Sequence, residues 1–228
     1  MDSTPKQPAG NATQTVRARS ILLFINFFLI ILAYYQVKSA RRSLLIEYWG
    51  ADNFPWVWMA SALVLGSFIG VYHQLVERYS RLGVVLGSCL LFMALLAGFR
   101  TALGWNPTAA SISFYIFVDI FSVILVEQFW SLANTVTGAA VGRKSYWFIG
   151  TGGLLGGVLG GVTAAALLKF TAMQTPDLLL SCAAILAITF LLNLMMGRMG
   201  LYQEVASSGP PLVAAGGWRT LASHRYLI

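Results

Sequence analysis

Residues Ser113–Ala133 read SFYIFVDIFSVILVEQFWSLA, and this stretch of 21 residues decides the class of fold. A helix needs about 20 mainly apolar residues to cross the hydrocarbon core of a bilayer, so the segment is long enough to span a membrane. None of the chain's long apolar runs shows the alternation that is typical of a membrane β-strand. The sequence therefore predicts an all-α membrane protein with six transmembrane helices. The other five runs are Ile21–Tyr35, Phe54–Val76, Leu82–Phe99, Tyr146–Leu168 and Leu178–Gly197.

The composition of the chain agrees with this class. Hydrophobic residues make up 57% of the sequence and charged residues only 10%, too few to cover the surface of a soluble domain. The net charge of +7 could indicate a nucleic-acid partner, but the basic residues flank the apolar runs instead of forming a patch. The expected partner is therefore the lipid bilayer, with no nucleic acid.

The distribution of Lys and Arg predicts the orientation of the helices. With the N-terminus inside, ten basic residues are cytoplasmic and five lie on the other side, as the positive-inside rule favours. We expect an inner-membrane protein with both termini in the cytoplasm. Residues 1–19 are expected to form a disordered tail, residues 20–200 the six-helix bundle, and residues 201–228 a linker and the start of a further helix. The five exceptions are Lys38, Arg41, Arg42, Arg100 and Lys169.

The three basic residues Lys38, Arg41 and Arg42 follow the first apolar run. Ile21–Tyr35 spans only about 22 Å at 1.5 Å per residue, so the first helix needs further residues to cross the core. The spacing i, i+3 and i+4 places the three basic residues on one side of that helix. They either reach toward the outer interface along their aliphatic stems, or line a water-filled cavity and bind an anion.

Two acidic residues, Asp119 and Glu127, lie within Ser113–Ala133. An isolated carboxylate inside a membrane is costly, so each is expected to be paired, protonated or in contact with water. One interpretation is an ion pair that fastens two helices, with a partner among residues 38–42. The other is a carboxylate that couples or gates transport.

Six glycines form a ladder in the fifth run. Three of them recur at every fourth residue, and the other three repeat this spacing one residue later. Such a stripe lets the backbone of another helix approach closely, so we expect a packing surface. A phosphate-binding loop is not expected, because no Lys-Ser/Thr follows the glycines and no soluble strand precedes them. The ladder consists of Gly152, Gly153, Gly156, Gly157, Gly160 and Gly161.

The sequence offers no pattern of residues for catalysis. HExxH and CxxC motifs are absent, and His73 and His224 are far apart. Cys89 and Cys182 lie in apolar runs without metal-like spacing, as expected of small packing residues. We therefore expect no enzyme activity, no cofactor and no metal.

Two stretches of the sequence are informative together. Residues 33–52 read AYYQVKSARRSLLIEYWGAD and are followed by Pro55. Residues 127–134 read EQFWSLAN and are followed by Arg143, Lys144 and the glycine ladder. Over most of residues 20–228 the chain resembles the ATP/ADP translocase (nucleotide transporter) family of the major facilitator superfamily.

The resemblance implies a fold and a site. The fold would be the N-terminal six-helix half of such a transporter, built from three-plus-three inverted repeats. A basic residue at the end of the first helix and an acidic residue in the fourth are linked to nucleotide transport in this family. Lys38 or Arg41, and Asp119 or Glu127, are the matching candidates. Family members often carry an acidic residue after the Asn of the Phe-Trp-x-x-x-Asn element, where this chain has Thr135.

Two functions remain open at this point. The chain is either half of a secondary carrier for nucleotides or other organic anions, or a non-transporting structural or assembly subunit of a larger membrane complex. The first requires a second six-helix half, whether in a longer chain or in a partner, and the second requires other membrane subunits. The absent acid at Thr135 and an exposed glycine ladder would suit the second.

Overall fold

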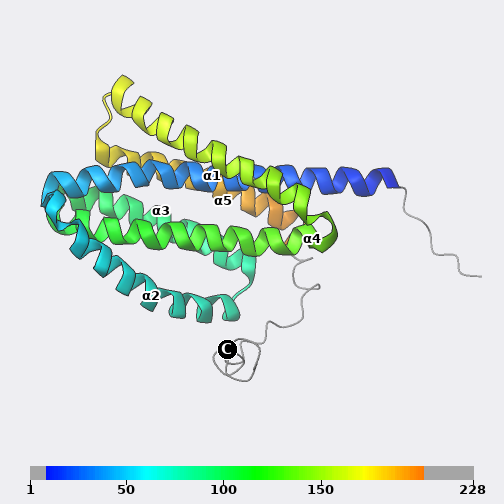
Figure 1. The fold of residues 1–228 in the computed structure, drawn as a ribbon. Helices are drawn as coiled ribbons and strands as arrows, with labels where there is room; N and C mark the ends of the chain where they lie inside the picture. Colours follow the sequence, from blue (N-terminus) through cyan, green and yellow to red (C-terminus); the bar gives the residue numbers. More distant parts are fainter. Residues whose placement is uncertain (1–8, 203–228) are drawn as a thin grey trace, which may run out of the picture.

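The structure is a computed structural model. It describes the backbone of residues 9–202, and the side chains of residues 17–68, 72, 78–134, 136 and 145–202. Every regular element in this part of the chain is a helix, as the sequence predicts (Figure 1). The elements are α1 (Ala9–Trp49), η1 (Ala51–Asn53), α2 (Phe54–Arg78), α3 (Arg81–Trp105), α4 (Pro107–Phe170), η2 (Thr175–Asp177) and α5 (Leu178–Arg198).

Helix α4 contains two apolar stretches that run in opposite directions. Pro107–Asn134 and Ser145–Phe170 are each long and apolar enough to cross a membrane. The rings of Trp130 and Tyr146 lie 6.0 Å apart, although a straight helix would separate residues 16 positions apart by about 24 Å. The chain therefore reverses between the two stretches, as Figure 1 shows. The fourth and fifth runs are therefore two antiparallel stretches, although both belong to α4.

Helix α1 differs from the prediction at its start. It begins at Ala9, whereas the sequence analysis assigned residues 1–19 to a disordered tail. Residues 1–8 lie outside the described part, and so does most of the predicted linker and further helix at 201–228. The apolar stretch of α1, Arg17–Trp49, includes the three basic residues, because the helix continues through them instead of ending at Tyr35.

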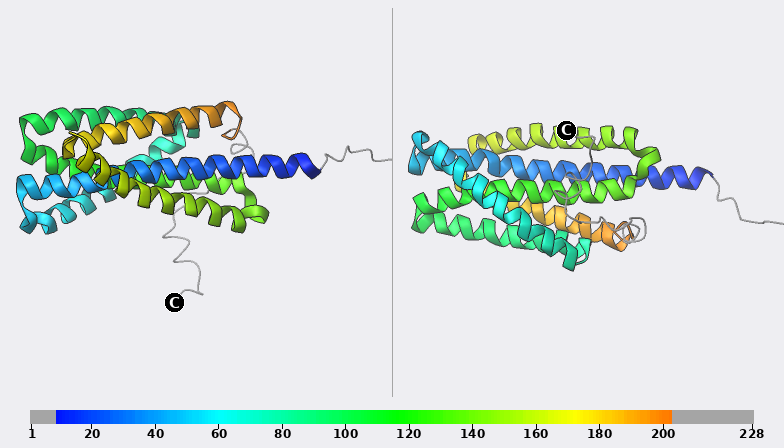
Figure 2. Two further views of the ribbon diagram at one scale, coloured as in Figure 1. Left: turned by 90° about the horizontal axis from the view of Figure 1, so that it is seen from above. Right: turned by 60° about the horizontal axis from the view of Figure 1, so that its bottom comes forward.

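The helices form an antiparallel bundle around α1. Helix α1 packs against α4 and α5, α3 packs against the same two helices, and α2 packs against α4. The views in Figures 1 and 2 place α1 between the two stretches of α4. They also place the start of α1 and the end of α5 at the same end of the bundle. Stacked aromatic rings fill the interior, such as those of Phe27 and Phe129, whose centroids lie 4.4 Å apart.

Local signals in the sequence set the helix boundaries. The Ser80 side chain accepts a hydrogen bond from the backbone N–H of Gly83 and caps α3. Asn106 caps α4 by accepting from the N–H of Ala109, and Pro107 occupies the first turn, where a missing N–H costs nothing. These short connections bring consecutive helices back along one another.

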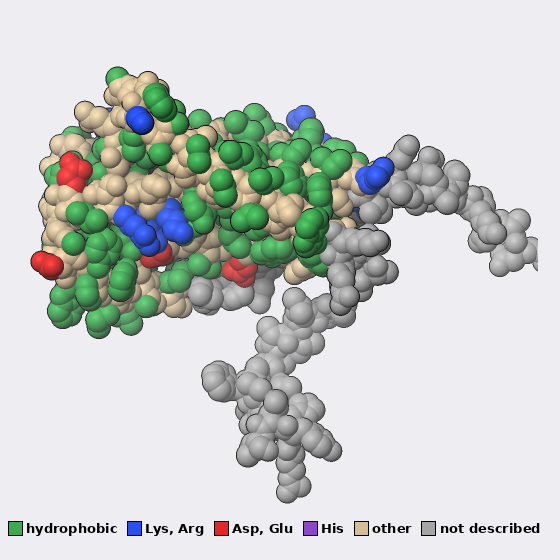
Figure 3. All heavy atoms as spheres, turned by 45° about the horizontal axis from the view of Figure 1, so that its top comes forward, with side chains coloured by type: hydrophobic (Ala, Val, Ile, Leu, Met, Phe, Trp, Pro, Cys, Tyr) green, Lys and Arg blue, Asp and Glu red, His purple; other side chains and the backbone are tan. Residues whose placement is uncertain are grey.

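The outer surface of the bundle is largely apolar. Large hydrophobic side chains are exposed on every long helix, including Trp105 at 92% and Leu63 at 74%. Apolar side chains dominate the face drawn in Figure 3. A soluble monomer rarely exposes contiguous apolar surface on this scale, whereas lipid tails cover it at no cost. Five of the described helical stretches are long and apolar enough to span, and the protein is a helical membrane protein.

Candidate functional site

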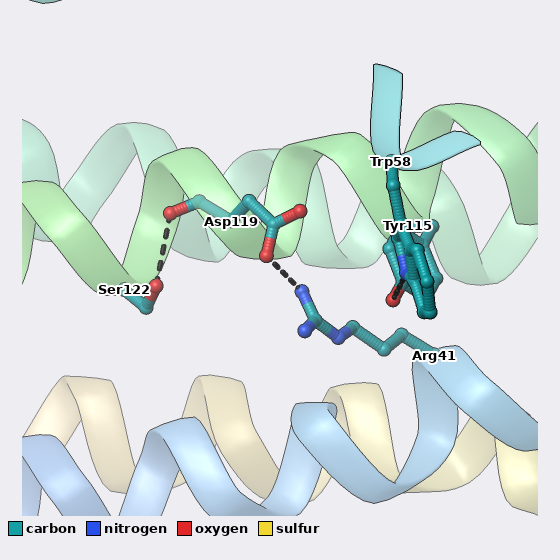
Figure 4. A network of polar contacts seen from close by, with 5 residues as sticks. All are labelled: Arg41, Trp58, Tyr115, Asp119 and Ser122. Atoms are coloured by element: carbon teal, nitrogen blue, oxygen red, sulfur yellow. Dashed lines mark hydrogen bonds and ion pairs between the residues drawn. The ribbon is translucent and has the colours of Figure 1, made fainter. Parts of the chain in front are cut away.

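The candidate site centres on an ion pair between two helices. Arg41 of α1 extends toward α4 and donates a hydrogen bond to the carboxylate of Asp119 (Figure 4). Arg41 is buried, with 7% of its surface exposed. Asp119 is 12 residues into a stretch of 28, so it lies near the middle of its span. The pair therefore lies inside the apolar part of the bundle, where ionisable residues are rare.

Aromatic side chains hold the Arg41 guanidinium in place. Its central carbon lies 4.4 Å from the centre of the buried Tyr115 ring, within the range of a cation–π contact. Trp58 of α2 donates a hydrogen bond of 3.0 Å to the Tyr115 hydroxyl and fixes that ring (Figure 4). The Arg41 Nε is buried and has no hydrogen-bond partner among the described residues. Arg41 therefore keeps unused donors beside its ion pair, and the buried Nε–H is one of them.

Lys38 and Arg42 do not join this pair. The Lys38 ammonium lies 4.7 Å from the centre of the Tyr35 ring and 5.4 Å from that of Tyr34. The Arg42 side chain is exposed. Neither forms an ion pair with another described residue. Figure 3 shows basic side chains gathered in the half of the bundle where α1 ends.

The predicted shared face of the three basic residues is only partly observed. Successive residues of a helix are separated by about 100°, so Arg41 and Arg42 cannot point the same way. Arg41 turns inward, Arg42 turns outward, and Lys38 lies between them against its tyrosines. Residues 38–42 of α1 carry three positive charges, of which Asp119 pairs with that of Arg41, and the next acidic residue of α1 is Glu47.

The other predicted carboxylate, Glu127, lies apart from this group. It is eight residues beyond Asp119 on α4, about 12 Å along the helix. It is close enough to Tyr72 to interact with it electrostatically, and it pairs with no described basic residue. The structure thus brings Asp119, and not Glu127, together with the basic residues of α1.

The glycine ladder packs against α1. A Cβ on Gly156 would lie 2.5 Å from the carbonyl oxygen of Phe28, and one on Gly152 would lie 2.7 Å from that of Phe24. Side chains of α1 fill the space beside Gly153, Gly157 and Gly160 in the same way, whereas Gly161 faces open space. The idea that an exposed ladder favours a partner subunit is therefore wrong, since α1 covers five of the six glycines.

Sequence reasoning missed a group of buried amides at the other end of the bundle. Asn26 of α1 donates a hydrogen bond of 2.7 Å to Asn193 of α5, and Gln128 of α4 donates one of 2.8 Å to Ser88 of α3. The signal was available, because an amide inside a long apolar run is costly unless it has a partner. Gln36, which donates to Thr163 at 2.7 Å, belongs to the same class.

No cluster of metal-binding side chains occurs in the described ranges of the chain. Groups of three or more His, Cys, Asp or Glu residues are absent there, and Cys89 and Cys182 are buried free thiols. Comparison of the chain with protein-family models, curated proteins and solved structures finds no match. The conclusions on function therefore rest on the protein's own geometry: a helical membrane protein with a charged pair buried between α1 and α4.

Proposed function

We propose that the protein is one six-helix half of a secondary carrier for nucleotides or other organic anions. The observation that carries the proposal is the buried Arg41 beside Asp119, with two further basic residues, Lys38 and Arg42, within one turn of Arg41 on α1. Buried positive charge is costly unless an anion compensates for it. Ionisable residues within spans usually line pathways for substrates or ions, and this site matches that use.

Arg41 would bind the anion directly. Its planar guanidinium suits bidentate contact with phosphate or carboxylate, and its free Nε supplies a donor beyond the bond to Asp119. Lys38 would act as a point charge, Arg42 would attract the anion from the surface, and Glu127 would serve as a coupling carboxylate. An entering anion would replace Asp119 as the partner of Arg41, and the ion pair would re-form after release.

Alternating access fits this exchange of partners. The first and fourth of six spans occupy corresponding positions in two three-helix repeats, and these two spans carry the pair. In such folds the binding site lies near the bilayer midplane, between repeats. The proposed partner is a second six-helix half, and the proposed location is an inner membrane with both termini cytoplasmic. Labelling of cysteines placed at Ser3 and Ser207 in intact cells tests this orientation, and reaction from outside would contradict it.

The decisive experiment measures uptake and abundance together. Cells producing the Arg41→Gln variant should lose uptake of labelled ATP and of smaller organic anions, while the amount of folded protein stays nearly unchanged. Arg100→Gln is the matched control, because Arg100 also pairs with an aspartate, Asp177, but at the end of the bundle. Normal uptake by Arg41→Gln would contradict the proposal.

A structural or assembly subunit is the second candidate, and the direct contact between Arg41 and Asp119 favours it. A pair that satisfies itself fastens α1 to α4 without any ligand. In that case the exchanged pair, Arg41→Asp with Asp119→Arg, should restore folded protein and its incorporation into a complex. A carrier needs the positive charge on α1, so the exchange would restore folding but not uptake.

A further inference from the structure

A small cavity lies inside the bundle, away from the Arg41 site. Its volume is about 10 Å³, enough for one water-sized ligand. Helices α1, α3, α4 and α5 all contribute to its wall. Asn26 is 15 residues before Arg41 on α1, so the two sites are about 22 Å apart along the helix. The polar residues in the wall are Asn26, Gln128, Thr189, Asn193 and Tyr202.

A chain of hydrogen bonds fixes how the amides face this cavity. The backbone carbonyl of Thr189 can only accept, so the amide nitrogen of Asn193 must face it, at 2.8 Å. The Asn193 Oδ1 then accepts from Tyr202 and from the amide nitrogen of Asn26, each at 2.7 Å. This order leaves the Asn26 Oδ1 without a partner.

Two oxygen acceptors on residues that line the cavity are unused. The Asn26 Oδ1 and the Gln128 Oε1 are both buried and unpartnered, on residues that are 1% and 7% exposed. The Thr189 hydroxyl already donates to the carbonyl of Ile185, and its lone pairs remain. Each of the five polar side chains in the wall donates a hydrogen bond to a protein atom. These oxygens therefore suit a ligand that is held by acceptors.

We propose that this cavity binds a single sodium ion. Two amide carbonyls and two hydroxyl oxygens form a ligand set of the kind that hard cations prefer. A buried water makes about three hydrogen bonds, and the second amide N–H of Asn193 and the Cys89 thiol are donors that it could use here. The comparison of salts described below therefore decides between water and sodium. A divalent cation fits less well, because no carboxylate lines the cavity to balance a second charge.

The site should be weak and specific. All its ligands are neutral, and Arg81 lines a second cavity of about 30 Å³ that shares Gln128 and Tyr202 with the first. A bound ion would tie α1 to α4 and α5 at the end opposite the Arg41 pair. If the protein is a carrier, sodium is then its coupling ion. The inference itself does not rest on transport, and its test uses no transported substrate.

The test uses the purified full-length chain in mild detergent. In about 150 mM sodium chloride its melting temperature should exceed that in the same concentration of N-methyl-D-glucamine chloride or potassium chloride. Gln128→Leu should abolish this increment and saturable binding of labelled sodium. Gln128→Glu should bind sodium about tenfold more tightly, because its charge attracts the ion and the Ser88 hydroxyl can rotate to donate to it.

Gln36→Leu is the matched control. Gln36 is 1% exposed and also carries an unpartnered Oε1, but it does not line this cavity. Its loss should lower the melting temperature equally in all three salts and leave the sodium increment intact. If neither the natural chain nor Gln128→Glu distinguishes sodium from N-methyl-D-glucamine, the cavity holds water and the proposal fails. Should Gln128→Leu not fold, Gln128→Glu decides alone.

Discussion

Two arginine–aspartate pairs join helices in this protein, and they differ in where they lie. Arg41 and Asp119 meet in the apolar part of the bundle, where 9% of the Arg41 side chain and 27% of the Asp119 side chain are exposed. Arg100 and Asp177 meet at the end of the bundle, 2.8 Å apart, where 38% of the Arg100 side chain is exposed. Water and ions screen the outer pair, which is expected to contribute at most about 1 kcal/mol. The inner pair includes a buried arginine and is less screened, so loss of one partner leaves the other without its ion-pair partner in the apolar part of the bundle.

The two aspartates also differ in their other partners. The Asp177 carboxylate accepts a hydrogen bond of 2.8 Å from the backbone N–H of Gln174, so it holds the η2 turn even without Arg100. Arg41 is the described partner of the Asp119 carboxylate. The same two residue types therefore serve as a local brace in one place and as a link between helices in the other.

The largest difference between the pairs should follow removal of the aspartate. Asp119→Leu leaves the Arg41 guanidinium charged and buried, because arginine does not release its proton in proteins. We expect a loss of about 3–5 kcal/mol of unfolding free energy, measured by denaturant titration in detergent. Asp177→Leu is the control and should cost about 1–2 kcal/mol, because it also removes the hydrogen bond from the Gln174 N–H. Equal losses of unfolding free energy for the two variants would show that the burial of Arg41 does not make the inner pair more important for stability than the outer pair.

Removal of the arginine should have a smaller effect on folding. Arg41→Gln leaves a carboxylate, which a proton can neutralise, whereas nothing neutralises a lone guanidinium. The inner pair is therefore expected to be asymmetric, with Asp119→Leu much more damaging to stability than Arg41→Gln. The same denaturant titration measures both variants. Comparable losses would mean that no proton reaches Asp119.

A substitution in the glycine ladder should displace α1 without changing either charge of the inner pair. A leucine at Gly156 would clash with the Phe28 carbonyl and push α1 away from Ser145–Phe170, at a cost of about 1–3 kcal/mol. Gly161→Leu is the control, because nothing lies within 4 Å of its Cβ, and its effect should stay within about 0.5 kcal/mol. Thermal unfolding of both variants tests this, and a stable Gly156→Leu protein would show that the close contact is dispensable.

The smallest effect concerns salt. A double-mutant cycle on Arg100 and Asp177 should give a coupling of about 0.5 kcal/mol, which falls in 1 M salt, where the screening length is about 3 Å. The same cycle on Arg41 and Asp119 should change less with salt, because the Arg41 side chain is buried. A buried pair whose coupling falls as steeply as that of the outer one would indicate an open, hydrated site.

Much of the bundle follows from the sequence, because length and hydrophobicity determine where a chain can cross a membrane. The glycine ladder was recognisable as a packing surface, although its repeat does not say which helix it contacts. The choice among Lys38, Arg41 and Arg42 could not be made in advance. The three side chains leave α1 in different directions, and the rotation of α1 about its axis decides which of them faces α4. Contacts such as that between Arg41 and Tyr115 of α4 set this rotation.

The choice between Asp119 and Glu127 as the partner of Arg41 could not be made from the sequence for a similar reason. Both carboxylates lie in one apolar run, and only the vertical register of α1 against α4 brings one of them level with Arg41. That register depends on many side chains packed along the interface, such as Phe27 against Phe129. The buried amides were visible as isolated polar residues, but their partners lie on helices far away in the sequence, such as Asn193 for Asn26.

The close fit of α1 against the glycines also limits how the protein can move. Backbone touches backbone along several turns, and the Phe27 and Tyr35 side chains occupy the recesses left by Gly153 and Gly160. Sliding these two helices past one another would drive those rings into the glycine backbone, so α1 and Ser145–Phe170 should travel as one rigid body. The seam that can open is then the one between α1 and Pro107–Asn134, which Arg41 and Asp119 bridge. A cross-link from α1 to the glycine-bearing stretch should leave any opening intact, and one across the Arg41 seam should arrest it.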